Sequence, residues 1–176
     1  MDRMRTTLAA LAFAAFAGLG LAATPSRQQA LDAISILEKN LTGPQATQAA
    51  KTVVVYAQLS DDVMVDIGPE QLPWATEEWG LDKDRELSLH SLLVAAFVAG
   101  DVKTQLKNEK AEDDTYSGWL FALAAYHRLK AAEDFRSPSL ETLSKMQAEG
   151  KLRQHAKDVH ADDQEDSSDA AQKPLA

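Results

Sequence analysis

Acidic side chains follow one another closely after residue 60, and carboxylate oxygens at short spacing are the ligands that calcium prefers in proteins. They are Asp61, Asp62, Asp66 and Glu70. The segment lacks the D-x-[DN]-x-[DN]-G pattern, followed by a glutamate, that defines a calcium-binding loop. We therefore interpret these side chains as helix caps and solvated charge, and we assign no metal ligand among them.

A second group near the C-terminus combines imidazoles with carboxylates, a donor set that can bind zinc, nickel or copper. Its members are His155, Asp158, His160, Asp162 and Asp163. The two histidines are five residues apart, whereas two side chains on one helix face are usually three or four residues apart. The sequence therefore predicts a mobile charged tail with neither a metal nor a cofactor.

Hydrolytic chemistry would need a serine activated by a histidine, and Ser88, His90 and Ser91 lie close together in the chain. No G-x-S-x-G nucleophile elbow accompanies them. Residues one or two positions apart on a helix also point in different directions. Because the chain contains no cysteine, a catalytic thiol, a disulfide and a thiolate metal site are excluded. We therefore expect a protein without enzymatic activity and assign no catalytic residue.

Aromatic residues offer a different kind of site, because rings gathered in space can line a pocket or a peptide groove. The candidates for such a ligand or partner surface are Trp74, Trp79, Tyr116 and Trp119. The alternative is that the same rings form the core that joins a long loop to two helices. The sequence leaves both interpretations open.

The formal net charge of −9 repels the phosphates of nucleic acids and the headgroups of anionic lipids. We therefore expect no nucleic acid partner. Binding to a basic partner, binding to cations and simple solubility remain compatible with this charge.

Apolar residues at helical spacing predict an all-α fold, an irregular bundle of about five helices. The expected N-caps are Ser26, Asp82 or Asp84, Asp114 or Thr115, and Ser137, while Pro44 is expected in the first turn of the second helix. The third helix is apolar on most faces around Phe97, which is typical of a central, buried helix. Gly100 within it predicts a bend or a close helix crossing.

A long connection with several prolines and tryptophans separates the second helix from the third. Val63, Val65 and Ile67 alternate with other residues, a pattern that favours an extended segment with one buried face. Because Trp74 and Trp79 need burial, we expect this loop to pack across one end of the bundle.

The N-terminus has the three parts of a secretory signal peptide. Arg3 and Arg5 precede an apolar run, and Gly20-Leu21-Ala22 provides small residues for cleavage. The run of about 15 residues is shorter than the ~20 that span a bilayer. We therefore predict a signal peptide over residues 1–22, a helical domain over 24–155, and a disordered acidic tail over 156–176, where large apolar residues are scarce.

These patterns together predict an exported protein, periplasmic or extracellular, that has no membrane association once the signal is cleaved. The expected function is that of a protein-interaction module with an unknown protein partner. The alternative is a periplasmic protein that binds a small ligand or a metal ion. The first interpretation depends on the lack of a recognisable catalytic motif, and the second on the aromatic loop or the acid and histidine tail.

Export predicts that the mature chain begins at Ala23 or Thr24, because signal peptidase cleaves after small residues. N-terminal sequencing of protein recovered from the exported fraction measures this directly. An intact Met1 in that fraction would contradict the prediction.

Overall fold

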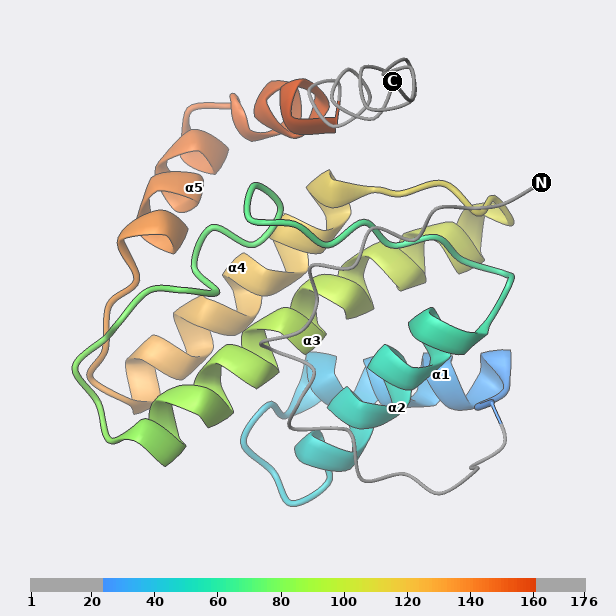
Figure 1. Cartoon of the computed structure of the whole chain (residues 1–176), viewed down its shortest axis with the longest axis horizontal. Helices are drawn as coiled ribbons and strands as arrows, with labels where there is room; N and C mark the ends of the chain where they lie inside the picture. The colour runs from blue at the N-terminus through green and yellow to red at the C-terminus, as the bar shows by residue number, and fades with distance from the viewer. Residues whose placement is uncertain (1–23, 161–176) are drawn as a thin grey trace, which may run out of the picture.

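The computed structural model describes residues 24–160, and all regular structure in that range is helical. The helices are α1 (Arg27–Lys39), α2 (Ala46–Leu59), α3 (Lys83–Asn108), α4 (Thr115–Ala132), α5 (Pro138–Ala148) and a further helix over residues 152–160. Figure 1 shows them as a bundle, so the all-α prediction is confirmed. The expected signal peptide lies outside the described residues.

Polar caps start four of these helices at predicted positions. Ser26 forms a capping box in which its Oγ accepts from the backbone N–H of Gln29 and its own N–H donates to the Gln29 side chain. Asp82, Asp114 and Ser137 also accept hydrogen bonds from first-turn N–H groups. Such caps satisfy donors that have no partner within the helix.

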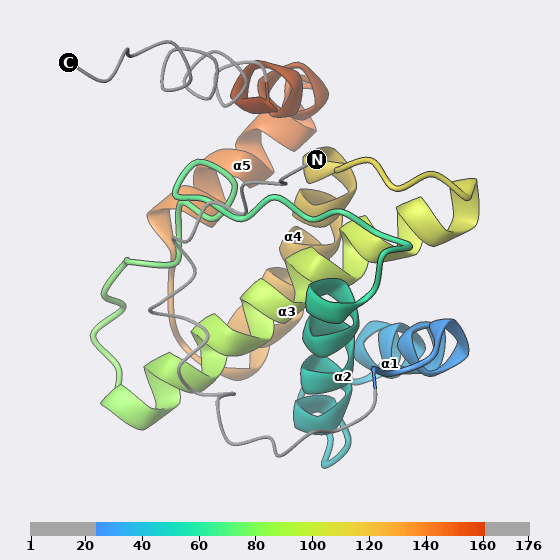
Figure 2. The ribbon, with the colours of Figure 1, turned by 45° about the vertical axis from the view of Figure 1, so that its right-hand side comes forward.

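The second helix begins two residues later than Pro44 would place it. Its first residue is Ala46, and the cap Gln45 makes no side-chain hydrogen bond. One face of α2 is nevertheless buried, through Ala46, Ala49, Ala50, Val53 and Val54, with Ala57 partly buried beside them. In Figure 2, α2 lies across α3, and α1 lies beside α2 on its right.

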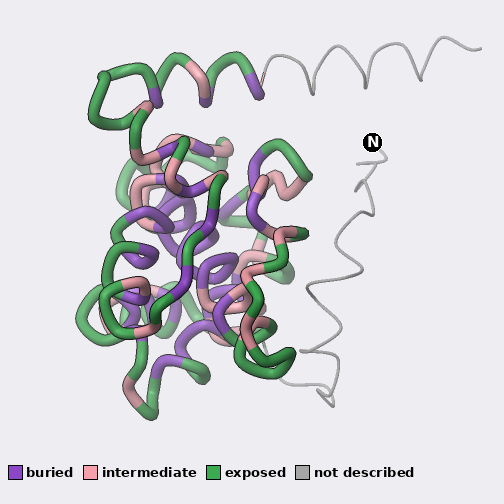
Figure 3. Tube along the Cα trace, turned by 90° about the vertical axis from the view of Figure 1, so that its left-hand side faces the viewer, coloured by how far each residue is buried: buried purple, intermediate pink, exposed green. Residues whose placement is uncertain are grey.

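Helix α3 is the central element of the bundle, as predicted. Every residue from 93 to 102 is buried. Figure 3 shows buried stretches of the chain gathered inside the bundle. Among residues 24–160, α3 is the one helix whose length and hydropathy would suit a membrane span. Because 61% of that apolar window is buried inside the protein, the core of the bundle accounts for its composition.

The crossing of α3 over α4 depends on two glycines. A Cβ atom on Gly100 would lie 2.4 Å from the backbone oxygen of Ser117 and 2.6 Å from Cβ of Phe121. A Cβ atom on Gly118 would lie 2.6 Å from the ring of Phe97. The predicted close crossing is therefore confirmed, and it brings the two backbones nearly into contact.

The connection over residues 60–82 runs along the α3–α4 pair, so the expectation that it packs across one end is wrong (Figure 1). It starts beside the last turns of α3 and must return to the first turn of that helix, which has 26 residues and is therefore about 39 Å long. Val63 is buried and the segment is extended, but it forms no strand. The backbone oxygen of Gln71 accepts from Trp119 Nε1 at 2.7 Å.

The boundary predicted for the disordered tail is also wrong at its start, because residues 156–160 continue a helix. Leu152, Ala156 and Val159 are all buried, and their spacing of four and three places them on one helix face. Gly150, with φ of 71°, separates this helix from α5. The rest of the expected tail lies outside the described residues.

Replacing Gly100 with alanine tests the crossing. The new Cβ atom would collide with a backbone oxygen, which cannot move aside as a flexible side chain can. We expect Gly100→Ala to lower the free energy of unfolding by about 1 to 2 kcal/mol, although alanine is the better helix former. Urea unfolding followed by far-UV circular dichroism measures the change, and an equal or higher midpoint would contradict the close approach.

Candidate functional site

Three potential metal ligands meet where the long connection, the α3–α4 loop and the 152–160 helix come together. Asp66, Asp113 and His160 each offer one ligand atom, and these atoms all lie within 4.8 Å of one another. Asp66 belongs to the first acidic group of the sequence and His160 to the second. The structure therefore joins one member of each group to Asp113, which the sequence did not single out.

The amide side chain of Gln105 positions the segment that carries Asp66. Its Oε1 accepts from the backbone N–H of Met64 at 2.9 Å, and its Nε2 donates to the backbone oxygen of Met64 at 2.5 Å. Both backbone groups of Met64 are thus bonded as a neighbouring strand would bond them. This pairing explains how residues 63–67 stay extended without forming a sheet, and it places Asp66 two residues further on.

Asp101 connects α3 to the loop that carries Asp113. Its Oδ1 accepts from Nε2 of Gln105 at 2.7 Å and from the backbone N–H of Asp114 at 2.9 Å. Asp114 is also the N-cap of α4. One buried carboxyl oxygen therefore joins the third helix to the start of the fourth.

Asp113 joins the two loops directly. Its Oδ1 accepts from the backbone N–H of Asp66 at 2.8 Å, and its Oδ2 accepts from the N–H and the hydroxyl of Thr115 at 3.1 and 2.8 Å. Hydrogen bonds of this kind fix the orientation of a ligating carboxylate before an ion arrives. Asp66 and Asp113 are therefore held in place by the protein itself.

The side chain of Asp101 is fully buried. Burial, and then the neighbouring Asp113 carboxylate, raise the pKa of Asp101 to about 9. At neutral pH this carboxyl group is therefore protonated. The side chains of Asp101 and Asp113 also share a hydrogen bond, in which the neutral Asp101 carboxyl group donates to the Asp113 carboxylate, and this contact further raises the pKa of Asp101.

The 152–160 helix brings the third ligand to the cluster by packing beside the first turns of α4. The ring of His155 stacks on Trp119, with the ring centres 5.1 Å apart and the planes at 23°, and Cζ of Arg153 lies 4.0 Å from the centre of the Tyr116 ring. His160 lies on this helix and joins the cluster, whereas His155 and Asp158 do not. Asp158 instead accepts from Nε2 of Gln154 at 2.7 Å.

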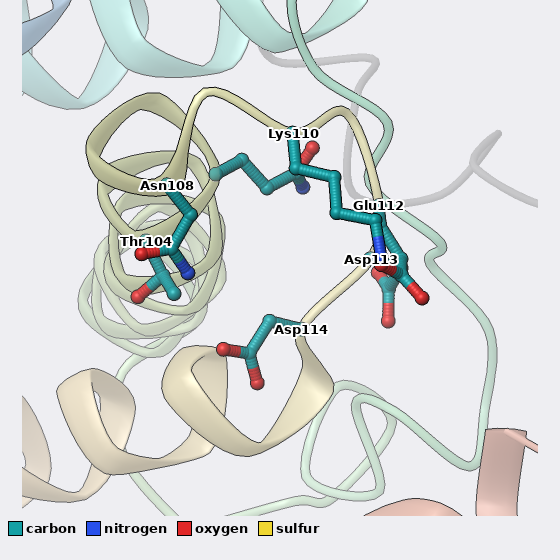
Figure 4. Close-up of a pocket in the computed structure, with 7 residues that line it drawn as sticks. Thr104, Asn108, Lys110, Glu112, Asp113 and Asp114 are labelled. Carbon is teal, nitrogen blue, oxygen red and sulfur yellow. The ribbon is translucent and has the colours of Figure 1, made fainter.

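A polar pocket of about 210 Å³ lies next to the cluster and shares Asp113 with it. The lining residues come from the last turns of α3, the loop after it and the start of α4, and Figure 4 shows them around the hollow: Thr104, Gln105, Asn108, Lys110, Glu112, Asp113 and Asp114. Lys110 forms an ion pair with Glu112. The pocket gives Asp113 a polar approach from solvent.

Three further polar candidates have structural contacts. Asp62 accepts a hydrogen bond from the Tyr56 hydroxyl at 2.9 Å. Ser91 donates to the backbone oxygen of Leu87 at 2.8 Å, as serines within helices often do. The ring of His90 packs against Trp79, with the ring centres 3.9 Å apart, and burial lowers its pKa. Ser88, His90 and Ser91 are therefore not arranged as a nucleophile and base.

The four aromatic residues do not form one exposed surface. Trp74 and Trp119 are fully buried, whereas Trp79 and Tyr116 are partly buried and pack against the core. Trp74 meets Phe97 of α3 edge to face at 6.3 Å. These rings join the long connection to α3 and α4, which was the alternative interpretation of the sequence.

Comparison with known protein families, with characterised proteins and with solved structures finds no match for this chain.

Asp101 predicts a specific dependence of stability on pH. Its pKa in the folded protein is about 9, above the ordinary value of 3.8 that applies on unfolding. Between about pH 4 and pH 9 the folded state therefore holds one more proton, so stability falls as the pH rises, by about 1.4 kcal/mol per unit.

The variant Asp101→Asn keeps an Oδ1 acceptor but cannot ionise. Urea unfolding is measured at several pH values between 5 and 8, with a chelator present. The free energy of unfolding of the variant, relative to that of the wild type, should rise by about 1.4 kcal/mol per pH unit. Parallel stability curves for the two proteins would contradict a protonated Asp101.

Proposed function

We propose that this is an exported, non-enzymatic protein that binds a divalent cation through Asp66, Asp113 and His160. The observation that carries the proposal is the convergence of these ligand atoms, within 4.8 Å of one another, from three separate segments. Two ligands that each lie about 2.1 Å from one ion are at most ~4 Å apart. Small side-chain rotations would therefore bring all three atoms onto a single cation.

The donor set favours zinc or a similar first-row ion over calcium or magnesium. One imidazole nitrogen and two carboxylate oxygens suit zinc, which also accepts water as a fourth ligand. Calcium takes six to eight oxygen ligands, and magnesium usually keeps several waters and avoids nitrogen. His160 is therefore the residue that sets the class of ion.

The surroundings of the cluster also support a bound cation. The formal charge of the chain is −9, and a surface of one sign concentrates counter-ions near it.

Export remains a proposal that depends on the N-terminal sequence alone. Binding to a protein partner, the first expectation from the sequence, has no specific support from residues 24–160. The large apolar side chains exposed there are Leu59, Met64 and Leu87, and nothing in the structure indicates what would cover them. Cation binding is therefore the function that we put forward.

Isothermal titration of the purified protein with zinc chloride tests the proposal. We expect one ion to bind per chain, and we expect His160→Gln and Asp66→Asn each to weaken binding at least tenfold. The loss should be at least as large as the ten- to hundredfold effect typical of outer-shell changes, because a direct ligand is removed. Calcium chloride at the same concentration should give no comparable heat.

A matched control is His127→Gln, which removes an exposed imidazole on α4 that contacts the Ser144 hydroxyl and lies outside the cluster. This variant should bind zinc like the wild type, and circular dichroism should show all variants folded. Equal zinc affinity for wild type and His160→Gln, or no binding by the wild type, would overturn the proposal.

A further inference from the structure

We infer that the cation regulates the position of the 152–160 helix, holding it against α4 when bound and releasing it when removed. This inference rests on the proposed cation site and adds a conformational consequence to it. Of the three ligands, Asp66 and Asp113 lie on loops that the core fixes, whereas His160 lies on the 152–160 helix. An ion that binds all three therefore links this helix to the rest of the bundle.

The two loops form a rigid half of the site before any ion binds. Gln105 holds the backbone of Met64, and Asp101 holds the backbone N–H of Asp114, and both side chains are buried in α3. The backbone N–H of Asp66 donates directly to Asp113. These contacts do not involve the 152–160 helix, so its departure would leave the two carboxylates in place.

The 152–160 helix itself has a modest packing surface. Its buried apolar side chains are Leu152, Ala156 and Val159, and two of the three are small. Its ring contacts are those of Arg153 on Tyr116 and His155 on Trp119. Helices gain most of their stability from tertiary packing, so the order of residues 152–160 depends on these contacts and on whatever binds His160.

Linkage gives the size of the effect. A ligand that binds both states favours the docked state by no more than the ratio of its affinities for the two states. The open state keeps both carboxylates but loses His160, so at a free ion concentration of 100 times Kd the docked helix should open about tenfold less often, or more rarely still. The same ion should leave local opening of α1 and α2 unchanged, because neither helix supplies a ligand.

Docking of the helix changes a specific part of the surface. His155 covers Trp119 and also lines an apolar pocket of about 240 Å³, together with Pro73 of the long connection and residues of α5. The other lining residues are Pro138, Ser139, Thr142, Leu143 and Met146. Release of the helix would remove one wall of this pocket and uncover the Trp119 ring.

Amide hydrogen exchange measured by mass spectrometry, on the full chain with zinc or with a chelator, tests the inference. At zinc concentrations near 100 times the Kd obtained by titration, exchange of residues 152–160 should slow about tenfold or more, while exchange in α1 and α2 should not change. In His160→Gln the same residues should exchange fast in both conditions, whereas His127→Gln should behave like the wild type. Protection of the α3 core in every variant shows that the bundle is still folded.

The outcomes separate this inference from the function on which it rests. If zinc binds in the titration but exchange of residues 152–160 is the same with zinc and with chelator, the regulation is refuted and the cation site stands. If zinc does not bind at all, the cation site fails, and the inference fails with it.

Discussion

The contact between the backbones of α3 and α4 is the constraint on which the rest of the structure depends. Gly100 has no side chain, so the carbonyl of Ser117 can approach the α3 backbone more closely than any Cβ atom would permit. The ring of Phe97 fills the corresponding space over Gly118. Because this contact fixes the depth of the crossing, it also fixes where the loop between the two helices lies.

The polar network follows from that crossing. Asp101 comes directly after Gly100, so it faces the start of α4 and bonds to the backbone of Asp114. Gln105, one turn later, reaches both Asp101 and the backbone of Met64. A buried polar group is costly unless it is hydrogen-bonded. The hydrogen bonds of the buried Asp101 and Gln105 are also the ones that set the two loops side by side. The carboxylates of Asp66 and Asp113 are thereby held together ahead of any ligand.

Local patterns in the sequence predict the helices well, because helix caps and apolar periodicity depend on residues that are near one another in the chain. Ser26, Asp82, Asp114 and Ser137 are caps by the chemistry of their own side chains, and the apolar periodicity of α3 shows its burial directly. The 152–160 helix was missed because only Leu152, Ala156 and Val159 carry its apolar stripe, amid charged neighbours. The candidate site was missed for a different reason. Asp66, Asp113 and His160 are 47 residues apart at each step, and only tertiary packing brings such residues together.

The coordination of a bound ion is the most direct test of the central claim, that separate segments converge on one cation. X-ray absorption spectroscopy of the zinc-loaded protein reports the number and kind of ligands around the metal. We predict a shell of nitrogen and oxygen atoms at about 2.0 to 2.1 Å, with the signature of a single imidazole. A shell of water oxygens alone, or a shell with two or more imidazoles, would contradict the site described here.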